Sequence, residues 1–504
     1  MTTTAPQPEH LDVVIVGAGL SGIGAAYRLQ TECPGRSYAV LEARDAMGGT
    51  WDLFRYPGIR SDSDMFTLGY PFKPWREAKS IADGPSILSY IRRTAAEYGI
   101  DERIRYRTKV VSADFSTRTA RWTLTLDVRD ETGRTEQRTL TCDFLYTCAG
   151  YYDYEQGHDP VFPGVESFGG TVVHPQFWPE DLDYRDKRVV VVGSGATAVT
   201  LVPSMAEDAA RVTMLQRSPT WISPVPGRDR IADGIRAVLP ADLAHRLLRA
   251  KNIAFTTGFY QFCRRWPKAA SKLLTRLSTR ALKDPEAVDE HFTPSYRPWD
   301  QRLCAVPDAD LFRAIRGGRA EVVTDHIESF VPEGIRLRSG RVLEADVVVT
   351  ATGLRLLAFG GITPHVDGRA VELSEQFVWR GAMLTGVPNF AMCIGYTNAS
   401  WTLRADLSSR LVCKVLQLMD RQGYAAVVPA PDRKLAERPL LDLDSGYVRR
   451  SIDAFPRQGD RWPWRMRQNY PLDAMATLRG DLAGDLSVTP RSAVRSGSTV
   501  EAAG

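Results

Sequence analysis

The sequence predicts an α/β protein built from two dinucleotide-binding, Rossmann-like domains. Residues 11–30 and 187–206 each run from an apolar strand through a glycine-rich turn into small apolar residues at helical spacing. Two further apolar strands, 143–152 and 346–354, end in small-residue turns and are expected where the chain crosses between the domains. With 504 residues and 43% hydrophobic composition, the chain is long enough for two or three domains.

The first turn has the pattern Gly17-x-Gly19-x-x-Gly22. The first glycine permits the tight turn, the second lets the backbone approach a pyrophosphate, and the third lets the helix pack on the strand. The next strand ends at Glu42, whose carboxylate can accept hydrogen bonds from ribose hydroxyls. A strand, a turn, a helix and an acid in this order predict a dinucleotide site.

The second turn is Gly193-x-Gly195-x-x-Ala198, with alanine at the packing position. The strand that follows ends at Arg217, where the first site has an acid. A guanidinium can bind a 2′-phosphate, which a carboxylate would repel, so we expect FAD at the first site and NADPH at the second. The competing interpretation makes Arg217 an ordinary solvated arginine.

These motifs predict a discontinuous FAD domain that is interrupted by the NADP domain. Polar, aperiodic residues 1–10 and the C-terminal tail are expected to be disordered. The expected boundaries are 11–150 for the first part of the FAD domain, 151–340 for the NADP domain with a helical insert at 226–292, 341–487 for the second part of the FAD domain, and 488–504 for the tail.

The helical insert is amphipathic and locally basic. We favour a lid over the substrate entrance with solvated charges, and the alternative is loose association with an anionic membrane or a partner. No apolar run approaches the roughly 18 residues that span a bilayer, so no firm membrane anchor is expected.

Composition excludes several other classes of function. A formal net charge of +4 is small for this length and gives no support to nucleic-acid binding. The seven cysteines form no CxxC pair, which fits a reduced cytoplasmic compartment. The seven histidines show no metal-binding spacing, so no metal is expected. Chemistry on a small molecule is the favoured class.

The segment 168–180 carries a longer motif that lies between the two nucleotide-binding patterns. Its fixed positions are Phe168, Gly170, His174, Trp178, Pro179 and Glu180. This pattern resembles the fingerprint of type I Baeyer–Villiger monooxygenases, members of the flavin-containing monooxygenase superfamily. The resemblance implies a hinge that couples NADP binding to domain orientation. The competing interpretation is a linker in which His174 bonds the backbone and Trp178 anchors packing.

Other segments extend the resemblance over nearly the whole chain. Residues 48–64 look like the flavin-side loop of the family, which implies FAD contacts for Gly49, Thr50 and Trp51. The segments "RPWDQRLC" (297–304) and "GYTNASWTL" (395–403) are similar to the subgroup of the mycobacterial ethionamide-activating monooxygenase.

The resemblance implies an NADPH- and O₂-dependent enzyme that converts ketones to esters or lactones through a C4a-peroxyflavin, with sulfoxidation as a side activity. Arg302 matches the arginine that stabilises the peroxide, and Asp62 matches the carboxylate that positions it. A buried arginine needs a nearby acid, and Asp64 is the alternative partner. Gln301 stands where relatives often have a lysine that holds the cofactor phosphate, so Arg217 carries more of the preference for NADPH over NADH.

Two alternatives remain open at this stage. In the first alternative, the same site has a sulfide or a thioamide as its physiological substrate. In the second, the chain is a non-oxygenating, NADPH-binding flavoprotein redox sensor. A disulfide reductase is disfavoured because a paired redox cysteine motif is absent from the sequence.

Overall fold

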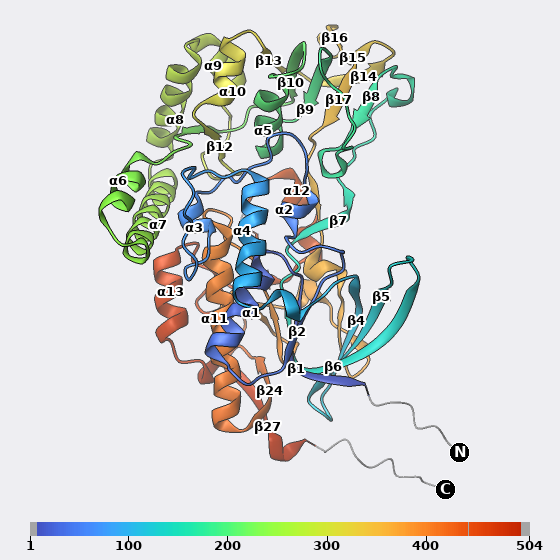
Figure 1. Ribbon diagram of the computed structural model, residues 1–504, viewed down its shortest axis with the longest axis vertical. Coiled ribbons are helices and arrows are strands. Elements are labelled where there is room, and N and C mark those ends of the chain that lie inside the picture. The colour runs from blue at the N-terminus through green and yellow to red at the C-terminus, as the bar shows by residue number, and fades with distance from the viewer. Residues whose placement is uncertain (1–7, 442, 495–504) are drawn as a thin grey trace.

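Two β-sheets with flanking helices organise the chain (Figure 1). The computed structural model describes residues 8–441 and 443–494. The sheet that contains the N-terminal strand lies in the lower half of Figure 1, and a smaller parallel sheet lies in the upper half. The α/β class with two Rossmann-like sheets agrees with the prediction.

The first sheet has a parallel part and an antiparallel part. Strand β1 pairs in parallel with β2 and with β6, so that Ile15 lies opposite Val40 on one side and Tyr146 on the other. Strands β4, β5 and β6 form an antiparallel meander. The strands are β1 (Glu9–Val16), β2 (Tyr38–Leu41), β3 (Ile104–Arg105), β4 (Thr108–Ser116), β5 (Arg121–Arg129), β6 (Thr135–Thr147), β19 (Pro364–Val366), β20 (Arg369–Ala370), β21 (Val378–Trp379), β22 (Met383–Leu384) and β23 (Phe390–Met392).

Helices from both ends of the chain belong to this part of the fold. The small residues of α1 allow close contact with β1, and apolar residues of α11 share the same buried core. The helices are α1 (Leu20–Glu32), α2 (Thr50–Leu53), α3 (Met65–Leu68), α4 (Gly84–Glu97), α11 (Trp401–Gln422), α12 (Gly446–Arg449) and α13 (Tyr470–Arg479). The discontinuity of the FAD domain therefore has a physical basis, because α1 and α11 come from its two sequence segments.

The second sheet is entirely parallel, and its strands are almost continuously apolar because both faces are covered. Its strands are β8 (Thr171–Val173), β9 (Arg188–Val192), β10 (Arg211–Gln216), β13 (Ala320–Thr324) and β17 (Val347–Thr350). Helices α5 (Ala196–Met205) and α10 (Asp310–Arg316) cover one face, and the hairpins β14 (Ile327–Val331), β15 (Gly334–Leu337) and β16 (Val342–Glu344) pack on the other.

The position of β17 corrects one expected boundary. Residues 347–350 fall in the range 341–487 that was expected in the FAD domain, but they pair with β9 and β8 of the second sheet. The chain returns to the first sheet only afterwards, through β18 (Leu354–Leu356), which pairs with β7 (Tyr152–Gly157). The parallel sheet needs β17 because it fills the position between β9 and β8.

Four helices form the insert, α6 (Arg230–Val238), α7 (Ala241–Arg265), α8 (Pro267–Leu282) and α9 (Pro285–Phe292). Helices α6 and α7 protrude to the left of Figure 1, whereas α8 and α9 pack beside the second sheet. Two short strands flank the insert in sequence and pair with each other, β11 (Ile222–Val225) and β12 (Cys304–Pro307). The insert is thus closed off by a β-pair at its base.

The chain termini differ from expectation. Strand β1 begins at Glu9, inside the range 1–10 that was expected to be disordered. Strand β27 (Leu486–Pro490) pairs with β24 (Tyr424–Pro429), and a 3₁₀ turn follows at Arg491–Ala493, so the expected disordered tail 488–504 is wrong for 488–494. Alternating side chains in a short antiparallel pair look polar in sequence, which hid this strand. Residues 495–504 lie outside the described residues.

The two glycine turns differ in how much space they leave. Gly17 and Gly193 have φ values of +100° and +140°, where side chains are strained. A Cβ at Gly22 would lie 1.8 Å from the carbonyl oxygen of Gly17, whereas the second turn accommodates the buried Ala198 at the matching position. The first helix therefore approaches its strand more closely than the second.

This difference predicts the effect of adding one methyl group. Gly22→Ala should lower the free energy of unfolding of the apoprotein by about 1–3 kcal/mol or more, because the backbone must shift. Gly195→Ala is the control, since no atom lies within 4 Å of its added Cβ. Chemical denaturation of both variants measures the effect, and equal stabilities would contradict this account of the packing.

Candidate functional site

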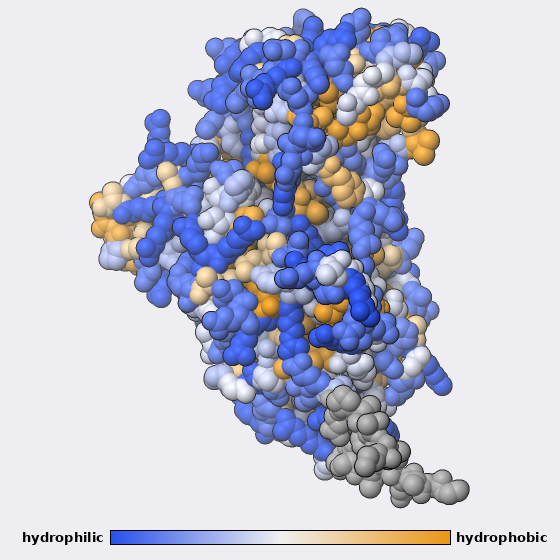
Figure 2. Space-filling model, turned by 45° about the vertical axis from the view of Figure 1, so that its right-hand side comes forward, coloured by the Kyte–Doolittle hydropathy of each residue, from blue (hydrophilic) through white to orange (hydrophobic). Residues whose placement is uncertain are grey.

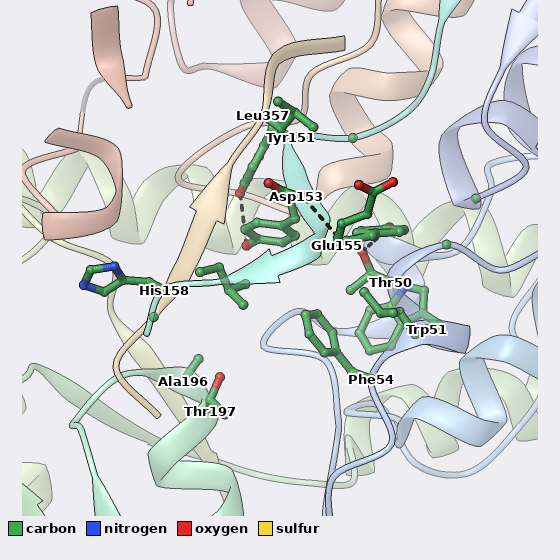
Figure 3. A pocket seen from close by; sticks show the side chains of 18 of the residues that line it. Thr50, Trp51, Phe54, Tyr151, Asp153, Glu155, His158, Ala196, Thr197 and Leu357 are labelled. Carbon is green, nitrogen blue, oxygen red and sulfur yellow. Dashed lines mark hydrogen bonds between the residues drawn. The ribbon is translucent and has the colours of Figure 1, made fainter. Parts of the chain in front are cut away.

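One large cavity of about 1500 Å³ lies between the two sheets. Both glycine turns line it, together with Glu42, Arg217 and Arg302. Figure 3 shows β7 crossing this region, with Thr50, Trp51 and Phe54 on one side and Ala196 and Thr197 at the start of α5 on another. The parallel strands of each sheet end toward the cavity, where α/β folds bind their ligands.

Glu42 holds the first turn in place. One carboxylate oxygen accepts the backbone N–H of Ala18 at 2.8 Å, and the other accepts the N–H of Arg44 at 2.9 Å. Burial raises the pKa of Glu42, and these two hydrogen bonds oppose that shift. The side chain also lines the cavity, so its remaining lone pairs are available to a ribose hydroxyl.

The first turn faces the flavin-side loop at close range. A Cβ at Gly19 would lie 3.5 Å from the Cα of Gly49, so only a small residue keeps this gap open. The Thr50 hydroxyl lies 3.1 Å from that of Tyr154 on β7, and Trp51 also lines the cavity. The N-terminus of α1, two glycines and a carboxylate form a cradle that fits a dinucleotide such as FAD.

The second turn forms a similar cradle at the start of α5. Gly193 lies against the carbonyl of Ala351, and no atom lies within 4 Å of a Cβ built at Gly195, which leaves room for a phosphate. Arg217 is exposed at the end of β10 and lines the same cavity. Neighbouring Gln216 instead donates to the carbonyl of His291 and is structural. These residues fit a second dinucleotide with a 2′-phosphate.

Arg302 and Asp62 meet where the two cradles share the cavity. Arg302 Nε lies 3.4 Å from Asp62 Oδ2, and the side chains are 37% and 16% exposed. Burial raises the pKa of Asp62, and the positive charges of Arg302 and Arg60 oppose that shift. The structure thus places these two predicted residues together, at the wall of the cavity.

Asp64, the alternative partner, has a different set of contacts. Its carboxylate accepts the backbone N–H and the hydroxyl of Thr67 and caps α3. It also accepts a hydrogen bond from Asn252 of α7 at 3.1 Å. Asp64 therefore holds the backbone next to Asp62.

Helix α7 contacts both loops that carry the central ion pair. Arg249 donates to the carbonyls of Phe66 and Gly69, each within 2.9 Å. Near the other end of the helix, Arg264 pairs with Asp300 at 2.9 Å, two residues before Arg302. Sequence reasoning missed this bridge, because the hydrogen bonds from α7 to the segment after Asp62 join residues 180 or more positions apart.

The fingerprint residues lie between the domains. His174 accepts the N–H of Gln176 and caps the short turn Pro175–Phe177, and a Cβ at Gly157 of β7 would lie 2.4 Å from its ring. Burial lowers the pKa of His174. Gly170 leaves room for Phe168, which packs edge-on against Phe330.

The end of the fingerprint packs against the core that the second sheet forms with α5 and α10. Trp178 contacts Tyr184 edge-on, Pro179 accepts the N–H of Leu182, and Glu180 pairs with Arg55 of the flavin-side loop. Neither His174 nor Trp178 is among the described residues that line the cavity. The motif thus connects domains and does not face the cavity.

The flavin-side loop supplies further contacts that the sequence did not suggest. Tyr56 is buried in the core of the second sheet, and Arg60 forms a bidentate pair with Asp310 of α10. A Cβ at Gly58 would collide with Ser204 of α5. The segment "RYPGIR" (55–60) contains the aromatic residue, the glycine and the arginine that make these contacts, and it was the only sequence signal for them. This loop fixes the distance between the two cradles.

Residues 8–441 and 443–494 contain neither a membrane-spanning helix nor a metal-binding cluster. No helix there combines the length and the apolar composition that crossing a bilayer requires. No group of three or more His, Cys, Asp or Glu side chains is arranged there to hold a metal ion.

Two family models match the chain. The model of flavin-binding monooxygenase-like proteins matches residues 70–230, and that of an NAD(P)-binding Rossmann-like domain matches residues 15–78. Among solved structures, an oxidized steroid monooxygenase bound to NADP has a TM-score of 0.73 at 20% identity, covering 95% of this chain and 99% of its own. An open structure of cyclohexanone monooxygenase has a TM-score of 0.71 at 19% identity, covering 95% and 100%. These two likenesses show the fold.

Curated relatives are much closer in sequence. The FAD-containing monooxygenase EthA of Mycobacterium tuberculosis is 53% identical over 94% of this chain and 96% of its own length. The probable FAD-binding monooxygenase AlmA of Acinetobacter baylyi is 46% identical over 93% of this chain and 94% of its own. Such identity over nearly the whole length of each protein leaves one conclusion: the chain belongs to the family of FAD-containing monooxygenases.

Proposed function

We propose that this enzyme is an NADPH- and O₂-dependent Baeyer–Villiger monooxygenase that converts ketones to esters or lactones, with sulfoxidation as a side activity. The observation that carries the proposal is the Arg302–Asp62 pair at the wall of a cavity that both nucleotide cradles share. FAD, when bound, supplies the electron transfer from NADPH and the reaction with O₂. The protein then has to place the ketone and stabilise charge.

Arg302 suits the task of stabilising negative oxygen. Its guanidinium stays protonated at working pH and lines the shared cavity, where its charge can act on a bound substrate. Asp62 orients the guanidinium through Nε and leaves the other N–H groups of the side chain for further bonds. During attack on a ketone, negative charge develops on the carbonyl oxygen, which such a fixed cation stabilises.

The two cradles have separate tasks in this proposal. Glu42 and the first turn, with Gly49, Thr50 and Trp51, hold FAD, and Arg217 beside the second turn binds the 2′-phosphate of NADPH. His174 and Trp178 connect the cradles without contacting substrate, which supports their interpretation as hinge residues. Helix α7 restrains the loop that carries Asp62 and the loop that carries Arg302, which limits the motion of the guanidinium.

Product analysis tests the reaction itself. The holoenzyme is incubated with NADPH and ¹⁸O₂ and with a cyclic ketone or the thioether of the same ring size. We expect a lactone with one labelled oxygen and, at a lower kcat/KM, a labelled sulfoxide. Efficient sulfoxidation without lactone would identify an S-oxygenase instead, and NADPH binding without product from either substrate would indicate a redox sensor.

Removing the central cation should slow oxygen transfer without stopping the reduction of FAD. We expect Arg302→Ala to reduce lactone formation by about 10²–10³-fold, because one stabilising group for a developing oxyanion is lost. Anaerobic reduction of FAD by NADPH should persist. Arg297→Ala, an exposed arginine of the same loop, is the control. Undiminished lactone formation by Arg302→Ala would refute the assigned role.

Selectivity for NADPH should depend on Arg217. We expect Arg217→Ala to raise KM for NADPH by about 10–100-fold, the value of a hydrogen bond to a charged group, with little change in KM for NADH. Steady-state kinetics with both cofactors measures the ratio. Arg211→Ala, at the opposite end of β10 and paired with Glu321, is the control. An unchanged ratio in Arg217→Ala would show that this side chain is merely solvated.

A further inference from the structure

The helical insert exposes an unusual share of large hydrophobic side chains. Seven of the fourteen such side chains in the described part of the chain lie on α6, α7 and α8 or at their junctions. They are Ile231, Val238, Leu243, Leu247, Phe255, Trp266 and Leu273, of which Val238 is 77% exposed and Phe255 68%. Concentrated exposure of this kind marks an interaction surface. We call this set the outer face of the insert.

Aromatic side chains run along one edge of the outer face. Phe255 stacks on Phe259 with ring centroids 6.2 Å apart, Phe259 lies 6.5 Å from Phe262, and Phe262 lies 6.0 Å from Trp266. The spacing of four, three and four residues keeps these rings on one side of the helix. Trp266 at the end of the row is 57% exposed. Aromatic rings with this exposure are favoured at the boundary between water and lipid.

Positive charge surrounds these hydrophobic side chains. Helices α7 and α8 contain nine lysines and arginines but a single acid, Asp242. Arg249 is buried, and Lys251 and Arg264 have carboxylate partners. Six more are exposed and form no ion pair with the described residues: Arg246, Arg265, Lys268, Lys272, Arg276 and Arg280. Figure 2 shows hydrophobic residues at the outer edge of the protruding insert, bordered by hydrophilic ones.

We propose that the outer face of the insert docks on the surface of an anionic lipid bilayer. The aliphatic and aromatic side chains enter the interfacial region, and the six basic side chains contact the headgroups. An excess of unpaired positive charge complements a negatively charged surface. The helices lie on the membrane and do not cross it, in keeping with their short apolar stretches.

The inner side of α7 packs within the protein, which leaves the outer face of the insert free to contact a partner. Buried Arg249 and Asn252 are bonded to the segment that begins at Asp64, so the inner side of the helix packs against the rest of the protein. A bilayer bound to the outer face would therefore be joined rigidly to the cavity wall. Docking needs no rearrangement of the fold.

Vesicle flotation of the full-length holoenzyme tests the proposal. The enzyme is mixed with vesicles of phosphatidylcholine alone or with phosphatidylglycerol added to 30 mol%, a composition of about one anionic lipid in three. We expect binding to the anionic vesicles, weaker binding at high salt, and little binding to neutral ones. Absence of binding to anionic vesicles at low salt would overturn the proposal.

Two sets of substitutions separate the hydrophobic and the electrostatic parts. Phe255→Ser with Trp266→Ser, or Lys268→Gln with Lys272→Gln and Arg276→Gln, should each weaken binding by about tenfold or more. Val161→Ser with Met475→Ser is the matched control, because both side chains are exposed outside the insert. FAD content and NADPH oxidation with a soluble substrate should be unchanged in all three.

The same variants also distinguish a bilayer from a second copy of the chain as the partner of this surface. Equal vesicle binding by the wild type and both insert variants would refute docking through this face. If light scattering showed a wild-type dimer that the Phe255→Ser/Trp266→Ser variant dissociates, and vesicles bound neither protein, the outer face would be an interface between copies of the chain.

Discussion

The contact between Arg302 and Asp62 sets the geometry on which the rest of the site depends. Each side chain comes from a loop that belongs to a different sheet, and each loses much of its water in the folded protein. A charge in such surroundings needs an opposite charge nearby, and removal of either partner leaves the other uncompensated. The two loops are therefore kept together, and the cavity between the two nucleotide cradles keeps one shape.

Several contacts make that arrangement rigid. The flavin-side loop enters the core of the second domain through Tyr56 and is attached to α10 by the pair between Arg60 and Asp310. Helix α7 holds the same loop through Asn252 and the loop of Arg302 through Arg264. Residues of the insert thus support the chemistry without lining the cavity. The same helix offers its other side to the surroundings, which connects a proposed membrane surface with the site by direct contact.

The fingerprint motif illustrates how a strong sequence pattern serves a structural purpose. His174 lies against β7 because Gly157 has no side chain, and Trp178 is packed in the second domain. These contacts tie the parallel sheet to the strand that crosses the cavity. The pattern is informative about family because many packing requirements coincide in a few residues, although none of the side chains that define it faces the cavity.

The sequence alone determined the two nucleotide cradles, because a turn, a helix N-terminus and the residue ending the next strand are fixed by local spacing. It also predicted Arg217 from its place after the strand that follows the second turn, and Arg302 and Asp62 through resemblance. Only the tertiary structure distinguished Asp62 from Asp64, assigned β17 to the second sheet, and showed that β27 is a strand. Those outcomes depend on pairing between distant segments, and local propensity cannot specify a partner that lies far away in the sequence.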